Sequence, residues 1–505
     1  MSGSLWMPPG ARPDTLPYVP RQRTPSWAQP DPIDELAERL DDFIAAAVHP
    51  DEIAALLESD GLSDDQIRER YGVKNSFALA EELYGRVERR HPEPDGPVHD
   101  PWQVGLLGCL LRGVVFALPG FGYVLGAPLL VGPKGDFSLP AGTVPLLAGA
   151  LCGWTWNQGL AHRAYSWLGL GDRSAARRSL LLGAPLGALL GALVAFAAAG
   201  TAHPAAVAFA AGQSGYLGAA TVLLVMGRER ALLAALLPMT AGAALALVHP
   251  VPDMARLALL LGSLAVVAAL ALREVAPAVK DLGEGSWTSG LTALLPFGAL
   301  GTASGRQRVA APWLAASLPY ALFGLGSGVL VLYAALGDVL TGEEHSAIAA
   351  PAAVALTLSM GPAEWLLYRF RSGSLAGLRS SSTPKAFWRS TTRTVVQCLA
   401  GYLASLLVLS LATSALWPHA PGIGGIRLAG LLLLGVVLWT GLLLQSFGAV
   451  TSAATVACAA ALAQTLSLVT HTGDPHWLGL IVYGTAAVAQ AGLVCGLLGR
   501  VTAHR

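Results

Sequence analysis

The chain has 505 residues, of which 53% are hydrophobic and 13% charged, and its formal net charge at pH 7 is zero. The nearly unbroken series of apolar stretches from Trp102 to Val501 excludes a soluble enzyme and predicts an all-α polytopic membrane protein. The five cysteines all fall inside predicted spans and form no CxxC pair, so neither a disulfide framework nor a zinc site is indicated.

The first thirty residues form a separate segment by composition. Residues 1–30 are rich in Pro and polar side chains and contain no apolar core, so they predict a disordered leader rather than a secretory signal. A leader that is not a signal peptide stays in the cytoplasm.

Residues 31–95 predict a small helical module. Pro32 suits a first helical position, and Ser63-Asp-Asp-Gln66 has the capping-box pattern that opens a short helix ending near Gly72. A further helix is expected from Phe77 to Arg90. Apolar residues recur at helical spacing in the first part of the module, at Ile33, Leu36, Leu40, Phe43 and Ile44.

The leader and module are acidic. Residues 1–100 hold 10 Lys/Arg and 20 Asp/Glu, against 22 and 12 in residues 101–505. An acidic helical surface suits a cytoplasmic protein partner, and it fits a solvated helical extension equally well. The sign of the charge argues against nucleic acid.

Twelve stretches are long enough to cross a bilayer as helices, which takes about 20 apolar residues each. They are 104–130, 141–160, 180–199, 205–226, 231–248, 255–272, 312–336, 348–368, 395–416, 428–446, 453–469 and 477–498. We interpret them as two six-helix bundles, 102–273 and 312–500. The cytoplasmic link between them, 274–311, includes an interfacial or re-entrant segment at 291–301.

Basic residues divide unevenly between the two sides of these spans. Alternating the loops between sides gives 18 Lys/Arg on one side, and only Lys134, Arg256 and Arg427 on the other. By the positive-inside rule the first side is cytoplasmic, and an even number of spans places both termini there. The abundance of Ala, Gly, Leu and Arg fits a high-GC bacterial genome, so we expect a bacterial inner-membrane protein.

The two bundles show signs of internal duplication. Ala117-Leu-Pro-Gly-Phe-Gly122 in the first span matches Ala321-Leu-Phe-Gly-Leu-Gly326 in the seventh at four of six positions. In nearly the same register, Gln158 to Arg163 at the end of the second span lies opposite Glu364 to Arg369 at the end of the eighth. These correspondences predict parallel six-helix repeats.

This pattern resembles the flippase superfamily of multidrug exporters and polysaccharide and lipid-linked oligosaccharide flippases. Gln158-Gly-Leu-Ala-His-Arg163 followed by Gly171-Asp-Arg-Ser-Ala-Ala-Arg-Arg178 looks like the family's link between its second and third helices. Gly212-Gln-Ser-Gly215 followed by Gly227-Arg-Glu-Arg230 is similar to its fourth-to-fifth helix hairpin. The family usually begins almost directly with the first helix, so the acidic module is a departure.

Ionisable residues inside spans are candidates for function because they are costly there. Glu364 could be a proton or cation site, or an interfacial ion pair with Arg369 or Arg371. Arg112 could bind an anionic head group, since its planar fork holds phosphate oxygens in pairs, or it could snorkel to the surface.

Uncharged polar side chains extend this set. Candidates for a substrate or ion path are Arg112, Asn157, Gln158, His162, Gln213, Glu364 and Gln445, and candidates for a cytoplasmic gate or ion pair are Arg163, Arg369 and Arg371. The alternative for the amide residues of this set is a structural role, because isolated amides in membranes commonly hydrogen-bond to neighbouring helices.

Three functions remain open. The resemblance implies a secondary transporter that moves a lipid-linked or polymeric saccharide, or another envelope precursor, outward. The alternative is a non-transporting scaffold or regulator of envelope growth, division or differentiation, acting through its module; a multidrug exporter fits less well, because the spans contain few acidic residues. No nucleotide-binding loop or nucleophile motif is present, so we expect neither an enzyme nor a cofactor or metal.

Overall fold

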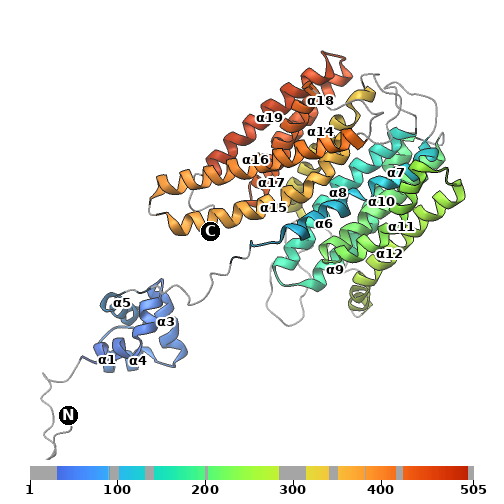
Figure 1. Ribbon diagram of the computed structural model, residues 1–505. Coiled ribbons are helices and arrows are strands. Elements are labelled where there is room, and N and C mark those ends of the chain that lie inside the picture. The colour runs from blue at the N-terminus through green and yellow to red at the C-terminus, as the bar shows by residue number, and fades with distance from the viewer. Residues whose placement is uncertain are drawn as a thin grey trace, which may run out of the picture. The chain divides into compact units, whose positions relative to one another are not determined.

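The computed structural model describes residues 31–88, 90, 100, 102–130, 142–199, 203–283, 314–340, 351–381, 383–416 and 425–498. The chain forms two compact units, Met1–His99 and Asp100–Arg505 (Figure 1). The expected disordered leader, 1–30, and the expected interfacial segment, 291–301, lie outside the described residues.

The first unit contains five short helices around one apolar core. The helices are α1 (Pro32–Arg39), α2 (Asp41–Ala46), α3 (Pro50–Ser59), α4 (Asp64–Tyr71) and α5 (Ser76–Arg86). Ile44, Ile53, Leu57, Ile67 and Leu79 are fully buried among them. A core of this kind holds the unit together independently of the second unit.

Local signals explain where these helices begin and end. The predicted capping box of α4 is present: Gln66 N donates to Ser63 Oγ, and Ser63 N donates to Gln66 Oε1. The helix stops at Gly72, whose φ is +68°. The single run of apolar residues expected from Ile33 to Ile44 is instead broken at Leu40, and Phe43 is 41% exposed.

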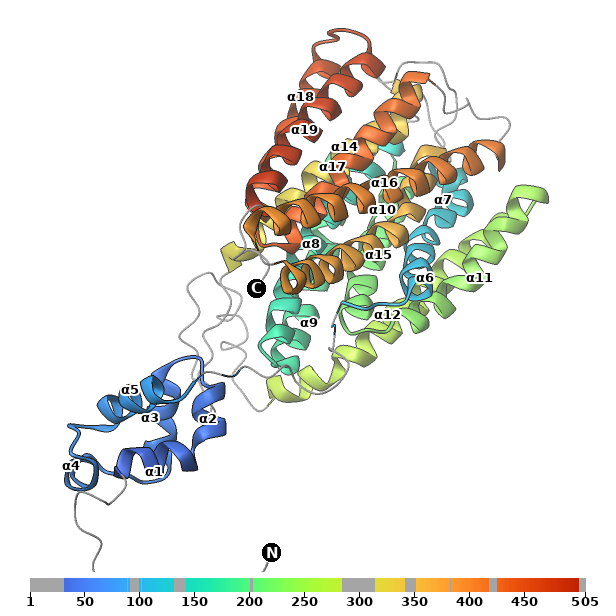
Figure 2. The ribbon, with the colours of Figure 1, turned by 60° about the vertical axis from the view of Figure 1, so that its left-hand side comes forward.

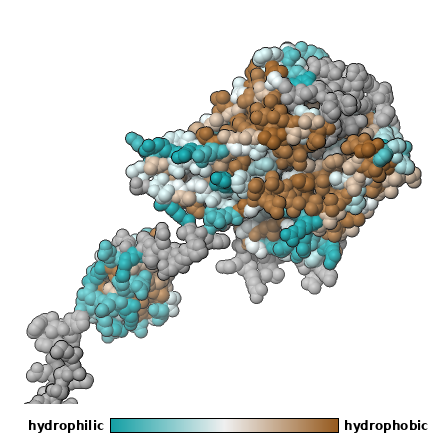
Figure 3. Space-filling view, viewed as in Figure 1, coloured by the Kyte–Doolittle hydropathy of each residue, from teal (hydrophilic) through white to brown (hydrophobic). Residues whose placement is uncertain are grey.

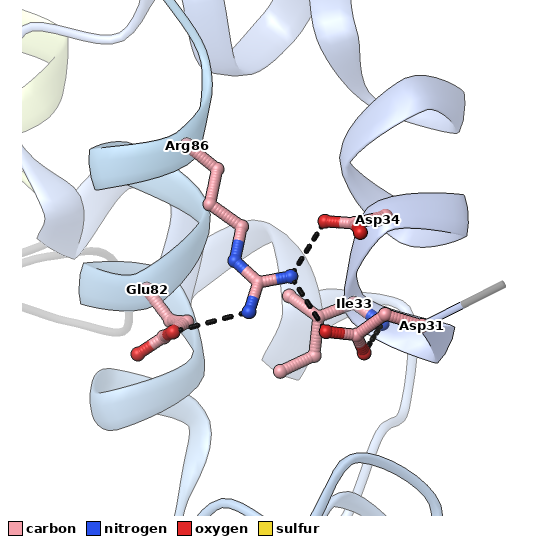
Figure 4. Close-up of polar contacts among 5 residues, drawn as sticks. All are labelled: Asp31, Ile33, Asp34, Glu82 and Arg86. Atoms are coloured by element: carbon pink, nitrogen blue, oxygen red, sulfur yellow. Dashed lines mark hydrogen bonds and ion pairs between the residues drawn. The ribbon is translucent and has the colours of Figure 1, made fainter. Parts of the chain in front are cut away.

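An ion-pair cluster joins the first and last helices of this unit (Figure 4). The Arg86 guanidinium donates to Asp31 at 2.9 Å, Asp34 at 2.6 Å and Glu82 at 3.2 Å. Asp31 also caps α1 by accepting from the backbone N–H of Ile33. These bonds, the Ile33 N–H first and Arg86 second, hold the pKa of Asp31 below its ordinary value.

The second unit is a bundle of long helices. In chain order they are α6 (Leu106–Ala117), α7 (Gly120–Gly126), α8 (Thr143–Gly169), α9 (Arg173–Ala199), α10 (Pro204–Val225), α11 (Glu229–Val248), α12 (Asp253–Gly283), α14 (Leu318–Leu340), α15 (Pro351–Ser380), α16 (Pro384–Leu416), α17 (Gly425–Ser446), α18 (Val450–Val469) and α19 (Pro475–Leu498). Short 3₁₀ turns follow α7 and precede α14, at Ala127–Leu130 and Leu314–Ser317.

The buried apolar residues of this unit form two large cores that share no element. One core, from Val115 to Val275, comes from α6 to α12, and the other, from Phe323 to Leu498, comes from α14 to α19. We call these parts of the chain the first and second halves. Since no helix contributes to both cores, the two halves are joined only where a helix of one half packs against a helix of the other.

Two helix pairs provide most of the packing between the halves. α6 packs against α15, and α8 packs against α14 (Figure 2). In contrast, α7, which follows α6 after Pro119, packs on α11 and α12 of its own half. The helices that meet across the halves are therefore α6, α8, α14 and α15.

Ten helices in the described part of the chain are long and apolar enough to cross a membrane. A brown apolar surface covers much of this unit in Figure 3. Two of the twelve expected spans do not meet this test, namely 141–160 on α8 and 348–368 on α15. The described parts of both stretches lie in the long helices α8 and α15, but polar residues such as Asn157, His162 and Glu364 lower the hydropathy of these helices.

The sixth span continues further than expected. α12 runs to Gly283, past the expected end of the first bundle at residue 273 and into the expected link 274–311. The ion pair between Arg228 Nε and Glu274 Oε1, at 2.6 Å, helps to hold this extension on the turn between α10 and α11. We call the end of the unit with the α8–α9, α10–α11, α15–α16 and α17–α18 turns the basic end.

Candidate functional site

Three charged side chains meet near the basic end, and each comes from a different helix. Arg112 of α6 donates through Nε to Glu229 of α11 at 2.8 Å, and through a terminal nitrogen to Glu364 of α15. The three side chains are 30%, 26% and 24% exposed. We call this group the charged triad; it contains two carboxylates and one guanidinium.

The triad joins the two halves of the bundle asymmetrically. Arg112 and Glu229 both belong to the first half, whereas Glu364 belongs to the second. Arg112–Glu364 is thus an ion pair that crosses between the halves. Loss of charge on Glu364 would therefore remove the crossing pair and leave the Arg112–Glu229 pair intact.

Glu229 stands where a carboxylate is favoured. It is the first residue of α11, and the unpaired N–H groups at a helix N-terminus attract negative charge. Glu364 lies two residues after Pro362, which interrupts the hydrogen-bond ladder inside α15. The backbone thus places one acid at a helix end and the other beside a helix irregularity.

The two helices that hold Arg112 and Glu364 touch through glycine. A methyl group built on Gly113 would lie 2.9 Å from the backbone nitrogen of Gly361, and one built on Gly361 would lie 2.7 Å from the carbonyl oxygen of Cys109. Only glycine allows the two backbones to approach this closely. The crossing point is therefore adjacent to the triad on both helices.

Tyr368 connects the triad to a neighbouring aromatic cluster. It lies one helical turn after Glu364 on α15, close enough to interact electrostatically with Glu364 and Arg112. Its ring stacks on Trp102, with the ring centroids 6.3 Å apart. Trp102 precedes α6, so Tyr368 contacts the chain just before the first helix of the bundle.

Arg371 clamps this region from α15. Its guanidinium carbon lies 4.4 Å from the ring centroid of Trp102 and 4.8 Å from that of Phe447, in the α17–α18 turn. Ser372 Oγ donates to the carboxylate of Asp100. We call Trp102, Arg371 and Phe447 the aromatic clamp. It fastens the segment before α6 to the second half, next to the triad.

The second crossing, between α8 and α14, is polar but contains no ion pair among the described residues. His162 Nδ1 lies 3.0 Å from Ser317 Oγ, and its ring stacks on Tyr320 with centroids 3.7 Å apart. Gln158 packs its side chain against Gly324. Asn157 is buried and donates to the carbonyl of Gly153 in its own helix.

The other predicted residues lie elsewhere. Gln213 donates to the hydroxyl of Tyr123 at 2.5 Å inside the first half, away from the helix pairs that cross between the halves. Gln445 lies at the end of α17, where its carbonyl accepts from Gly448. Arg163 is buried near the end of α8, and Arg369 lies over the ring of Trp365 at 5.3 Å.

One interpretation of the charged residues was wrong in its choice of partner. Glu364 pairs with Arg112, not with Arg369 or Arg371, because both of those guanidinium groups face aromatic rings. Arg112, which was expected either to bind an anionic head group or to snorkel to the surface, has two carboxylates within reach of its fork. Glu229 was not predicted as a site residue, because it appeared only as part of the Gly227-Arg-Glu-Arg230 turn. The one signal in the sequence was that it is an isolated acid between Arg228 and Arg230.

An apolar groove of about 590 Å³ opens between α6, α15 and α16. It is lined by Leu110, Val114, Leu358, Pro362, Ala404, Ser405, Val408 and Leu409. The Ser405 hydroxyl donates to the carbonyl of Gly401 in its own helix. The groove therefore offers an almost wholly apolar surface. Leu110 and Val114 are each two residues from Arg112, so the groove and Arg112 lie on different faces of α6.

The described residues contain no group of three or more His, Cys, Asp or Glu side chains placed to hold a metal ion. No protein-family model matches the chain, and no curated protein is similar to it in sequence.

Proposed function

We propose that the chain is a flippase-like secondary transporter of the bacterial inner membrane, with the charged triad as its gate. The observation that carries this proposal is the Arg112–Glu364 pair, which links the halves at a glycine crossing while Glu229 holds Arg112 in the first half. Alternating access requires two bodies that separate on one side, and a pair of this kind can hold them together.

The charge of the triad supports proton coupling. With both carboxylates ionised the group carries one net negative charge in a partly buried position, which favours uptake of a proton or another cation. A proton on Glu364 would remove the charge that attracts Arg112 across the halves. The halves could then separate at the basic end, which we propose faces the cytoplasm.

The packing supports two six-helix repeats and twelve spans. If α6–α7 and α14 are the first helices of the two repeats, then α8 and α15 are the second ones. In that numbering, α6–α15 and α8–α14 are the same contact, first helix against second helix, made twice. A two-fold relation between the repeats would produce this arrangement.

The proposed cargo is a lipid-linked or polymeric saccharide or another envelope precursor, moved outward. The groove between α6, α15 and α16 supports a cargo with a hydrocarbon chain, because its lining is apolar and it is formed in part by α6 and α15, the two helices that hold the Arg112–Glu364 pair. The cargo class itself comes from the resemblance to flippases.

The test is translocation by the full chain in proteoliposomes. The probe is a polyprenyl-linked oligosaccharide with a fluorescent label, whose translocation is measured by protection from a membrane-impermeant quencher. Glu364→Gln and Arg112→Ala should abolish translocation, whereas Glu274→Gln, which removes an ion pair within the first half, should retain it. Unchanged translocation in both triad variants would remove the triad from the mechanism.

A second candidate function is a scaffold or regulator that acts through the acidic unit. The separate core of that unit and the clamp on the segment before α6 favour it. Deleting residues 1–95 distinguishes the two functions. A transporter should keep its basal translocation, whereas a scaffold should lose its cellular phenotype while its membrane part still folds.

A further inference from the structure

The hairpin of α15 and α16 extends well beyond the length needed to cross a bilayer. α15 has 30 residues and α16 has 33, whereas about 20 residues are sufficient. Counting about 20 residues back from Leu416, the end of α16, places the membrane boundary near Gln397. Residues 384–396 of α16 therefore lie outside the hydrocarbon, next to the boundary.

The two helices of the hairpin pack closely on their inner faces. A methyl group on Gly373 would lie 2.9 Å from the side chain of Thr394, and one on Gly377 would lie 3.0 Å from Ser390. Phe387 and Thr391 of α16 are also buried. With this face occupied, the opposite face of α16 points away from α15.

The outward face of α16 is cationic. Lys385, Arg389 and Arg393 recur every four residues, so they lie along one side of the helix, and all three are exposed. The same side contains Trp388, which is 39% exposed, and Val396, which is 59% exposed. Figure 3 shows the hydrophilic residues at the projecting end of the hairpin and the apolar surface that adjoins it.

No carboxylate balances this charge within the described structure. None of the three cations forms an ion pair there, whereas Arg112 and Arg228 both do. The sequence contains no Asp or Glu between Glu364 and Asp474. These unpaired cations lie beside a tryptophan, on a helix that continues into the membrane. Such a surface is chemically suited to bind lipid headgroups.

We propose that the outward face of α16, formed by Lys385, Trp388, Arg389 and Arg393, binds the phosphate headgroups of anionic phospholipids. Lipid is favoured over an acidic protein because the face continues through Val396 into the membrane-facing side of the same helix. Trp388 anchors at the interface, and the long basic side chains reach back to the phosphates. Since α15 contains Glu364 and Arg371, lipid bound here would act on the helix that closes the gate.

The experiment uses delipidated full-length protein in a neutral detergent and counts bound phosphatidylglycerol and phosphatidylcholine by native mass spectrometry. A cationic side chain near a membrane surface contributes about fivefold in affinity. The triple variant Lys385→Gln/Arg389→Gln/Arg393→Gln should therefore bind phosphatidylglycerol up to about a hundredfold more weakly, with phosphatidylcholine binding unchanged. The wild-type preference should also fall as the salt concentration rises.

The matched control removes three exposed cations elsewhere near the basic end, by Arg173→Gln/Arg230→Gln/Arg273→Gln. It should keep the phosphatidylglycerol preference, and its folding can be compared by thermal unfolding. An equal loss in the control would show diffuse attraction by net charge and would overturn the proposal. So would a wild-type protein without a preference for phosphatidylglycerol. Neither result depends on transport activity.

Discussion

Gly113 of α6 and Gly361 of α15 meet backbone to backbone, and they lie next to Arg112 and three residues before Glu364. A methyl group on Gly113 would lie 2.9 Å from the Gly361 nitrogen. The close approach of the helices and the ion pair that links them therefore occupy one place in the structure. Any change that separates the two backbones also stretches the charged triad.

We predict that Gly113→Ala and Gly361→Ala both force α6 away from α15. The added methyl group meets backbone atoms that cannot rotate away, so each variant should lose about 1–3 kcal/mol of stability. Thermal unfolding in detergent measures the loss. Gly108→Ala is the control, because Gly108 lies on the same helix with no atom near its methyl position, and a gain or no change is expected there.

Removing Arg112 should cost more stability than neutralising the whole triad. Arg112→Ala leaves the Glu229 and Glu364 carboxylates without this cation in a partly buried place. Breaking a buried ion pair in this way costs about 3–5 kcal/mol. We expect a loss of about 3 kcal/mol, because the triad side chains are a quarter to a third exposed. The triple variant Arg112→Met/Glu229→Gln/Glu364→Gln should recover most of that stability. If the triple variant unfolds at the same temperature as Arg112→Ala, the triad is not the source of the loss.

Two of the three triad residues could be predicted from the sequence, and Glu229 could not. Arg112 and Glu364 were predictable as candidates because charged residues are rare in apolar spans. Their pairing was not predictable, since Arg112 lies 117 residues from Glu229 and 252 residues from Glu364 in the sequence. Only the three-dimensional packing of α6, α11 and α15 brings them together.

The helices themselves were easier to predict than their roles. The described parts of 141–160 and 348–368 lie in helices, yet their polar residues leave these two spans below the hydropathy of the other ten. Packing explains this, because α8 and α15 lie between the halves and turn those faces toward α14 and α6. In the first unit, the cap at Ser63 was readable from sequence, whereas the break at Leu40 has no Gly or Pro to mark it.

The aromatic clamp should depend on the planar guanidinium of Arg371. Arg371→Lys keeps the charge but cannot stack between Trp102 and Phe447, so we expect a loss of about 1 kcal/mol in thermal unfolding. Arg369→Lys, at a single ring 5.3 Å away on the same helix, should change stability less. Equal effects of the two substitutions would argue against the clamp.

The first unit should lose stability in acid through Asp31. Its folded-state pKa is lowered by the Ile33 N–H and by Arg86, so its contribution is fully present above its unfolded pKa of about 3.9 and disappears as pH falls through the lower folded value. Urea unfolding of fragment 31–99 between pH 7 and pH 2 measures this. Asp31→Asn should flatten the dependence, whereas Glu38→Gln, an exposed acid in the same helix without an ion pair in the described structure, should not.

The separation of the halves at the basic end tests the gate most directly. Spin labels at Leu107 of α6 and Ala376 of α15, both exposed, would report it by pulsed electron resonance after the native cysteines are replaced with alanine. We predict that Glu364→Gln lengthens the distance between the labels, as acidic pH does in the parent, while Glu274→Gln leaves it unchanged. Identical distance distributions for Glu364→Gln and the parent would contradict the proposal that the triad holds the halves together.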